Sequence, residues 1–475
     1  MTRPGWVGAA LLCAAAALEA CSGKPRLSQI EADLTRTQEE WLREEPVRLL
    51  RDYVRIDTTD KLGELDGAEF LRRLLDCGGI ETEIVCPAPR RCNLLARLPG
   101  RRREGALLLL NHIDVVQVYP ELWKDAPPFE GRIRLGFLYG RGAYDMKSLG
   151  LAQALALRSL AGQGIVPDSD ILFLAEADEE ETQRWGSRWL LEHRPEWFTG
   201  VSGVLNEGGT NEMILREVRF WGVETLQAGY GQLELESADP ALLTALAGRW
   251  PKLSAAPVAP HPHVVLGFNM LANHLGHPLT DPLRHLDRVR ENPAELAMLP
   301  DRYGAFLEPR IFWSPPYVFP PGAKGHFRQY AIVSTPPAVD PVTYLGPIEE
   351  DARRHVRVVS ASSSGPTIAS PYPTPLTEVL RQAIEARYPG VAFGPVPTFG
   401  GSTTSIYFRN RGIAAYGFSP LAANITDSSR RHGNDERIFL RDYVDGVNIY
   451  SHILRALAVP SGQSGKKTSA PEGQK

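Results

Sequence analysis

Short, wholly apolar runs alternate with longer helical segments along most of this chain. The run at 106–110 is followed by a hairpin-like stretch, an apolar helical segment at 149–160 and a second expected buried strand at 170–175, which is apolar after Asp170. A run of about five apolar residues is typical of a strand buried on both faces. Strands that alternate with helices of this length predict a mostly parallel sheet, so we expect an α/β fold.

The pattern changes at about residue 220 and returns to the first type after 365. Between these points, segment 232–237 alternates like a half-exposed strand, and 328–335 and 357–360 have the composition of further strands. Segments 376–388 and 440–457 are expected to be helices of the resumed α/β region. The chain is therefore expected to contain two regions of different architecture.

The first 21 residues predict an export signal. Arg3 is the only charge before an apolar segment at 6–18, and the small residue Ala20 then precedes Cys21. This resembles a bacterial lipoprotein signal, in which Cys21 is lipidated; an ordinary cleaved signal is the alternative. The apolar segment is short for a membrane-spanning helix. We expect an exported protein of the bacterial cell envelope or periplasm that contacts the membrane only through its lipid anchor.

Length and composition limit the number of domains and the kinds of partner expected for this chain. A chain of 475 residues suggests two or three domains, and a net charge of -4 without a long basic run outside the tail does not favour nucleic acid as a partner. We expect residues 22–44 to form a linker and an N-terminal helix, with helical periodicity from 27 to 54, and 459–475 to be a disordered tail. An exported protein permits one disulfide among Cys77, Cys86 and Cys92, and the pairing stays open.

Candidate chemistry begins where the first apolar run ends. His112 and Asp114 follow that run, and on an extended chain their side chains point to the same face. A histidine beside a carboxylate is the usual arrangement of a metal ligand and the group that orients it. An unrelated surface His and Asp is the alternative at this point.

Two acidic segments follow later apolar runs. Five carboxylates lie within residues 176–181, and Glu207 ends the apolar segment 203–205 and precedes two glycines. Neighbouring carboxylates repel one another unless cations or solvent compensate. A solvated acidic loop is the alternative to a metal site.

Three motifs that occur in order favour a metal site over these alternatives. They are H-x-D-V-V at 112–116, W-x-x-x-P-P-F at 123–129 and Y-G-R-G-x-x-D-x-K at 139–147. With them the chain resembles the co-catalytic zinc metallopeptidases, which include aminoacylase, carboxypeptidase S, succinyl-diaminopimelate desuccinylase and glutamate carboxypeptidase. The resemblance implies an α/β, mostly parallel-sheet catalytic domain at 45–219 and 366–458. It also implies an inserted α+β lid domain at 220–365, through which a homodimer would form.

The same resemblance implies a ligand set for two Zn²⁺ ions, which Co²⁺ or Mn²⁺ could replace. Glu179 would be the general base, Asp114 would hold the His112 ring, and Gly400, Gly401 and Ser402 would belong to a substrate-binding loop. The roles of Glu179 and Glu180 depend on the register of the acidic segment. They hold if Asp178 begins the family's D-E-E pattern, with Gly186 after it. The implied ligands are Asp145 as the bridge, His112 and Glu207 for one metal, and Glu180 and His432 for the other.

The activity implied is hydrolysis of an amide bond in small peptides or N-acyl amino acids. The lid departs from the family pattern, because its expected His is missing and Ser334 stands where an Arg binds the substrate carboxylate. Another cation, such as Arg328, Arg409 or Arg431, would then take over, or the substrate lacks that carboxylate. The alternative function is a catalytically weakened or non-catalytic exported binding protein on the same fold.

Overall fold

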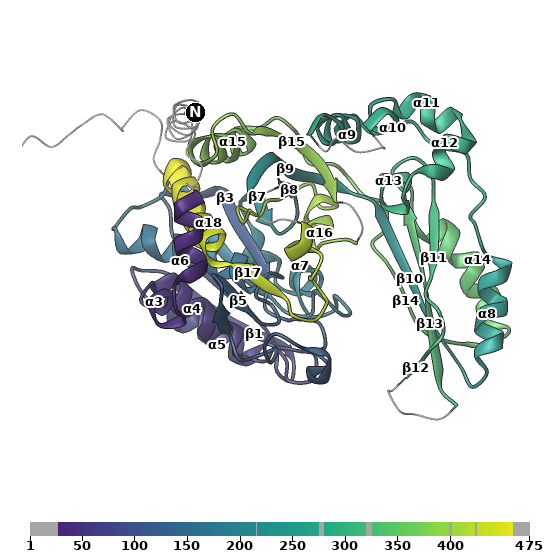
Figure 1. The fold of residues 1–475 in the computed structure, drawn as a ribbon, viewed down its shortest axis with the longest axis horizontal. Helices are drawn as coiled ribbons and strands as arrows, with labels where there is room; N and C mark the ends of the chain where they lie inside the picture. The colour runs from purple at the N-terminus through teal and green to yellow at the C-terminus, as the bar shows by residue number, and fades with distance from the viewer. Residues whose placement is uncertain are drawn as a thin grey trace, which may run out of the picture.

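The computed structural model describes residues 27–214, 216–274, 280–319, 325–398, 401–422 and 425–458. The predicted signal with Cys21, the predicted tail and Gly400 lie outside these residues. Figure 1 shows a large domain with a central sheet and a smaller domain that projects to one side.

The large domain is built on a sheet of nine strands among the described residues, and its central pairs are parallel. Antiparallel pairs occur between β1 and β2, β2 and β6, β16 and β9, and β8 and β9. The expected α/β class with a mostly parallel sheet is therefore confirmed. In spatial order the strands are β1 (Glu81–Ala88), β2 (Arg91–Leu98), β6 (Ser169–Glu176), β3 (Arg102–His112), β7 (Val201–Asn206), β16 (Ala414–Gly417), β9 (Glu217–Gln227) and β15 (Ala392–Thr398), with β8 (Thr210–Ile214) beside β9.

Alternate leucines of β3 enter two different hydrophobic layers. Leu107 and Leu109 pack into the core on one face of the sheet, whereas Leu108 and Leu110 pack into the core on the other. A strand covered on both faces needs an unbroken apolar run, which is why 106–110 contains no polar residue. The first layer holds α4 (Glu45–Val54), α5 (Leu65–Leu75), α6 (Lys147–Gly162), α15 (Pro375–Arg387) and α18 (Leu440–Ala458); the second holds α7 (Ser187–His193), η2 (Pro195–Phe198) and α16 (Ser405–Arg409).

The expected helical stretch 27–54 is divided into three helices. Thr37 and Glu40 form a capping box that begins a new helix, and Pro46 lies in the first turn of the next one. Both features favour the start of a new helix over continuation of the preceding one. Buried Trp41 joins these helices to the core of the large domain. The helices are α2 (Leu27–Thr35), α3 (Gln38–Leu42) and α4; a small sheet of β17 (Arg437–Phe439), β5 (Phe137–Tyr139) and β4 (Arg132–Arg134) lies against this region.

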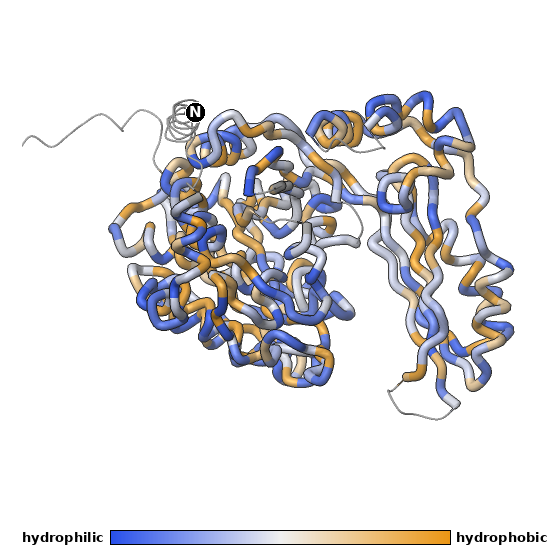
Figure 2. The backbone as a smooth tube through the Cα atoms, viewed as in Figure 1, coloured by the Kyte–Doolittle hydropathy of each residue, from blue (hydrophilic) through white to orange (hydrophobic). Residues whose placement is uncertain are grey.

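The smaller domain is an α+β lid whose sheet is covered by helices on one face. Apolar residues at alternate positions of β10 and β13, including Leu233, Leu235 and Val333, face α8 and α14. Figure 2 shows the alternation of apolar and polar positions along these strands. The elements are β10 (Gly229–Ser237), β11 (Arg310–Trp313), β12 (Tyr317–Val318), β13 (Phe327–Thr335), β14 (Arg357–Ser363), α8 (Pro240–Arg249) and α14 (Val342–Arg353).

Two parts of the range that we assigned to the lid pack with the large domain instead. Residues 220–227 belong to β9 and pair with β15, a strand more than 160 residues later in the chain. Helix α9 packs on β15 and β9, so that Phe220 and Leu226 share a core with α9 and the short helices after it. These helices are α9 (Pro262–His274), α10 (Thr280–Arg284), α11 (Leu286–Glu291), α12 (Pro293–Met298) and α13 (Asp301–Gly304).

Two further findings concern covalent links and membranes. Cys86 and Cys92 form a disulfide across the turn between β1 and β2, and Cys77 is a free, exposed thiol. Among the described helices, none is both long enough and apolar enough to cross a bilayer.

Candidate active site

The candidate ligands gather where the central parallel strands end. His112 is the last residue of β3, Glu207 directly follows β7, and Glu180 lies in the loop after β6. The carboxyl ends of parallel strands face the same edge of a sheet, which is the usual place for a ligand site in an α/β fold. The sheet therefore collects side chains that are far apart in the sequence.

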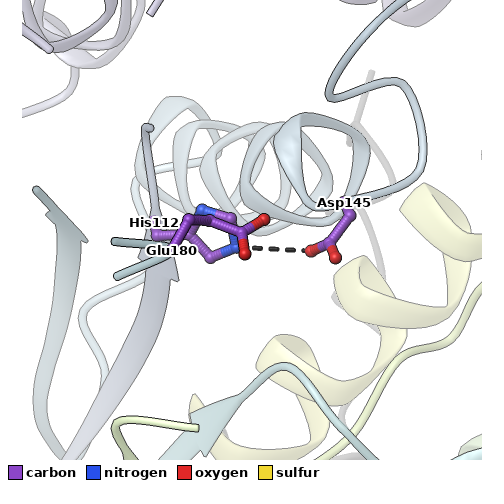
Figure 3. A group of neighbouring side chains, drawn as sticks. All are labelled: His112, Asp145 and Glu180. Atoms are coloured by element: carbon purple, nitrogen blue, oxygen red, sulfur yellow. Dashed lines mark hydrogen bonds and ion pairs between the residues drawn. The ribbon is translucent and has the colours of Figure 1, made fainter. Parts of the chain in front are cut away.

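Asp145 lies between the two candidate histidines, in the loop before α6. Its Oδ1 is 3.3 Å from Nε2 of His112, and its Oδ2 is 3.2 Å from Nε2 of His432. Figure 3 shows the carboxylate of Asp145 facing the His112 ring, with Glu180 beside them. Each oxygen of this carboxylate thus faces a different imidazole, which is the arrangement expected of a bridging residue.

Each half of the cluster contains one further carboxylate. On one side Glu207 Oε1 is 3.8 Å from Nε2 of His112, and on the other Glu180 Oε2 is 3.0 Å from Nε2 of His432. The ligand atoms of His112, Asp145 and Glu180 lie within 4.8 Å of one another, as do those of His112, Glu179 and Glu207. The structure therefore brings together the five predicted ligands and the predicted base.

The acidic segment after β6 divides into groups with different surroundings. Both oxygens of the Glu176 carboxylate are engaged, one by the Thr404 hydroxyl and one by the backbone N–H of Ser187. Asp178 accepts hydrogen bonds from its own loop, and Glu181 is exposed. This leaves Glu179 and Glu180 as the acids of the segment that face the cluster.

Asp114 connects His112 to that acidic loop in an unexpected way. Nδ1 of His112 is 2.9 Å from the main-chain carbonyl of Asp114 and 3.7 Å from its carboxylate. The carboxylate instead accepts from the backbone N–H groups of Glu179 and Glu180, at 3.1 and 2.9 Å. The expectation that the carboxylate holds the ring is therefore corrected: the carbonyl contacts the ring, and the carboxylate positions the loop that carries the base.

Glu436 holds the loop that carries Asp145, a role that the sequence did not reveal. One of its oxygens accepts from Arg141 Nη1 and the Gly142 N–H, at 2.6 and 3.1 Å. The other accepts from the N–H groups of Tyr144 and Asp145, at 2.8 and 3.0 Å. Glu436 is the last residue of the H-G-x-x-E motif that begins with His432, so its spacing was the available signal.

The electrostatics of the cluster favour added positive charge. Burial, and next the charge of Asp145, raise the pKa of Glu207 to about 8. Burial and then Glu207 raise the pKa of Glu179 well above its usual value. Hydrogen bonds to Asp145 and Glu180 raise the pKa of His432 to about 10. Carboxylates packed this closely repel one another, and a cation among them relieves that repulsion.

The donor set fits divalent metal ions. Two imidazole nitrogens and several carboxylate oxygens are donors that zinc accepts, and the oxygens also suit harder divalent ions. Because Asp145 offers one oxygen to each half, the described residues hold ligands for two ions around one bridge.

The predicted substrate-binding loop is described only in part. Gly401 is exposed with a φ of +81°, Ser402 is half-buried, and Gly400 lies outside the described residues. Nearby, the side chain of Gln227 accepts from the Thr403 N–H, and Thr404 donates to Glu176. Thr404 therefore donates to the buried carboxyl of Glu176 beside the cluster.

A cavity of about 430 Å³ opens beside the metal-ligand cluster. Asp145, Glu207 and Arg431 are among its lining residues, and Arg431 Nε is 3.7 Å from Asp145 Oδ2. Leu271 of α9 and Arg302 and Tyr303 of α13 also line it, so the helical segment after the first lid strand contributes to the site. These three lining residues were not predicted from the sequence, because they belong to an irregular succession of short helices.

Comparison with known proteins identifies the class. The family model described as peptidase family M20/M25/M40 matches residues 108–456, which is more than half of the chain. The chain belongs to this family, which confirms the resemblance drawn from its motifs.

Two relatives show how the similarity is distributed. A protein of Staphylococcus aureus (strain Mu50) named probable succinyl-diaminopimelate desuccinylase is 34% identical over 148 residues. That match covers 31% of this chain and only 36% of the relative. The N-fatty-acyl-amino acid synthase/hydrolase PM20D1 of Xenopus tropicalis is 27% identical over 366 residues, covering 70% of this chain and 68% of the relative.

Solved structures confirm the two-part fold. Human carnosine dipeptidase 1 superimposes with a TM-score of 0.65 at 17% identity, covering 92% of this chain and 99% of the other. The dipeptidase Dug1p of Saccharomyces cerevisiae gives a TM-score of 0.63 at 15% identity, with the same coverage. At these identities the likeness concerns the fold alone.

Proposed function

We propose that this protein is a metal-dependent hydrolase that cleaves the C–N amide bond of small peptides or N-acyl amino acids. The observation that carries the proposal is the Asp145 carboxylate, whose two oxygens each face a different histidine. A carboxylate shared in this way, with Glu207 and Glu180 on its two sides, is suited to hold a pair of divalent ions. The names of the relatives agree with this reaction class.

The ions that we propose are two Zn²⁺, with Co²⁺ or Mn²⁺ as alternatives. His112 and Glu207 would hold one ion, Glu180 and His432 the other, and Asp145 both. When bound, such a pair supplies a Lewis acid that polarises the amide carbonyl and makes water more acidic.

Glu179 is the residue that we propose as general base. It is largely buried, it faces His112 and Glu207, and the Gln183 amide donates to it at 3.3 Å. Its carboxylate would take a proton from the attacking water and then return that proton to the leaving amine.

The test separates the base from the ligand beside it. Glu179→Gln keeps the side-chain shape and should retain both metals while hydrolysis falls by about 10²–10⁴-fold, the usual contribution of a general base. Glu180→Ala should instead lower metal content, measured by elemental analysis. The exposed neighbour Glu181→Gln is the matched control and should change neither. Unchanged turnover in Glu179→Gln would remove Glu179 from the role of base.

A second candidate function is a non-catalytic binding protein. The lid favours it, because Ser334 stands where the family pattern has an arginine and β10 ends at Ser237 without the expected histidine. Purified protein that holds two metal ions but cleaves no peptide or N-acyl amino acid would support this alternative over the hydrolase.

We also propose that the protein is exported and lipid-anchored at Cys21, and that the lid forms a homodimer. The charged start, apolar segment and Cys21 of the N-terminus support the first proposal. Mass spectrometry of the mature N-terminus would test it, and an unprocessed Met1 would refute it. Light scattering would test the dimer, and a monomer at micromolar concentration would refute it.

A further inference from the structure

We propose that Arg302 binds a carboxylate of the substrate in the cavity beside the metal-ligand cluster. This inference rests on the proposed function and names its substrate class, an amide with a free carboxylate. Arg302 and the cluster residues Asp145 and Glu207 line the same cavity of about 430 Å³. A cavity of that size falls in the range that accommodates small-molecule ligands.

Arg302 is available for such a contact because its neighbouring acid is already engaged. Asp301 accepts from Arg310 at 3.1 Å, and Arg310 also pairs with Glu308 at 2.8 Å. Arg310 can approach closely because Gly304 has no side chain; a Cβ there would lie 2.4 Å from its guanidinium. Within the described part of the chain, Arg302 has no carboxylate at ion-pair distance. Its guanidinium is therefore free to pair with an anion that enters the cavity.

The aromatic residue beneath Arg302 is packed into a hydrophobic core. Tyr303, over whose ring the Arg302 guanidinium lies at 4.9 Å, is 7% exposed and packs edge-on against Phe268 of α9. Phe306 contacts the same ring of Phe268, and all three aromatic residues belong to one core with β9. A planar guanidinium held on an aromatic ring has lost part of its freedom already, so less is lost when it forms two parallel hydrogen bonds.

The other candidate cations are engaged elsewhere. Arg328 binds Glu234 and Glu236 at 2.7 and 3.3 Å on the lid sheet. Arg409 is buried and binds Glu224 at 2.6 Å behind the cluster. Arg431 lines the cavity, but its Nε lies 3.7 Å from Asp145, the shared carboxylate of the cluster. Of the four arginines, Arg302 is the one that combines access to the cavity with an unengaged charge.

The bound carboxylate has two possible sources within one substrate class. It could be the C-terminal carboxylate of the amino acid that leaves, or a carboxylate at the end of a dicarboxylic acyl group. Apolar lining from Met146, Leu149 and Leu271 favours an aliphatic body between this carboxylate and the scissile amide. Three ligands with a leucine core distinguish the sources: N-acetyl-L-leucine, N-succinyl-L-leucinamide and the uncharged N-acetyl-L-leucinamide.

The test measures equilibrium binding, so that it does not depend on turnover. Calorimetry uses the metal-loaded full-length Glu179→Gln protein, with and without Arg302→Met. We expect one of the two carboxylate ligands to bind about 10–100-fold more tightly than N-acetyl-L-leucinamide, as hydrogen bonds between charged groups imply. Arg302→Met should remove this preference. Arg302→Lys should keep part of it, because lysine retains the charge and loses the planar fork.

Arg284→Met is the matched control. Arg284 is an exposed arginine of α10 that donates to Asn273 and does not line the cavity, so all three affinities should stay unchanged. The inference is overturned if Arg302→Met keeps the carboxylate preference, as it would if the metal ions alone bound the carboxylate. It is also overturned if neither carboxylate ligand is preferred.

Hydrolysis by the protein with Glu179 intact tests the proposed function separately. Binding through Arg302 without cleavage would refute the hydrolase and leave this inference standing.

Discussion

The two halves of the metal-ligand cluster are built by different means. His112 ends a central strand, its side chain is 1% exposed, and its partner Glu207 directly follows the neighbouring strand. His432 lies in a loop between α17 (Ile425–Ser428) and β17, its side chain is 51% exposed, and its φ is +61°. One half is therefore positioned by the hydrogen-bonded sheet, and the other by loops.

The loop-borne half is kept in place by a buried ion pair. Glu436, four residues after His432, binds Arg141 and the backbone that leads to Asp145. The segment that carries His432 is thereby fastened to the segment that carries the shared carboxylate. Ligands that lie close together in space are therefore held by different parts of the fold, one half by the sheet and the other by loops.

The largest effect is expected at the residue that both halves share. Asp145→Asn keeps the shape but replaces one oxygen by an amide nitrogen, which binds no metal. Metal content should fall in both halves, and activity should fall beyond the roughly 100-fold that changes to supporting residues cost. Elemental analysis and kcat/KM measure these effects. The variant Asp287→Asn, at an exposed position of α11, is the control. Full occupancy in Asp145→Asn would refute a shared carboxylate.

A smaller effect on metal binding is expected to distinguish the two halves from each other. His112→Ala and His432→Ala should both weaken metal binding, but added imidazole should restore binding mainly in His432→Ala. The reason is access, because the His432 side chain is 51% exposed and that of His112 is 1% exposed. Metal titration with and without imidazole measures the restoration. Equal rescue of the two variants would show that the buried half is as open as the loop-borne half.

The sheet-borne half was also the half that the sequence predicted most directly. The run before His112 has to be apolar on both faces, so the end of the strand, and with it the ligand, is visible in the sequence. The motif order placed Asp145, Glu180 and His432 with it. The contact between the His112 ring and the Asp114 carbonyl was not predictable, since it depends on the backbone path after the strand.

Residues that depend on distant pairing could not be predicted. Residues 220–227 of β9 were assigned to the lid, because the composition of this segment does not reveal that its partner is β15. Arg302 lies in a four-residue helix after several short ones, and the packing of Tyr303 on α9 holds this helix beside the cavity. Local patterns determine the type of an element, whereas its neighbours are determined by the whole chain.

The support of the loop-borne half can be weakened without touching a ligand. Glu436→Gln leaves Arg141 buried without its negative partner, and removing one member of a buried pair costs about 3–5 kcal/mol in the free energy of unfolding. Metal affinity should also fall, by about 10–100-fold. Chemical unfolding of the metal-free protein and metal titration measure the two effects.

Arg141→Met provides the matched control for that pair. Combined with Glu436→Gln, it removes both charges, so the double variant should lose less stability than the sum of the single losses. Additive losses would mean that Glu436 and Arg141 do not act as a pair. The loop would then be held by the backbone hydrogen bonds of Glu436 alone.

The smallest effect is expected at Asp114, which joins the two halves. Its carboxylate accepts from the N–H groups of Glu179 and Glu180, while its carbonyl contacts His112. Asp114→Asn keeps the carbonyl and one side-chain oxygen, so one N–H loses its acceptor and the His112 contact remains. Metal affinity should fall by about tenfold, near the lower limit for supporting residues. Activity should fall more than affinity, because the displaced loop carries the proposed base.

The control is Asp168→Asn, an exposed acid paired with Arg102. If Asp114→Asn lowered affinity as much as His112→Ala, the carboxylate rather than the carbonyl would be holding the ring.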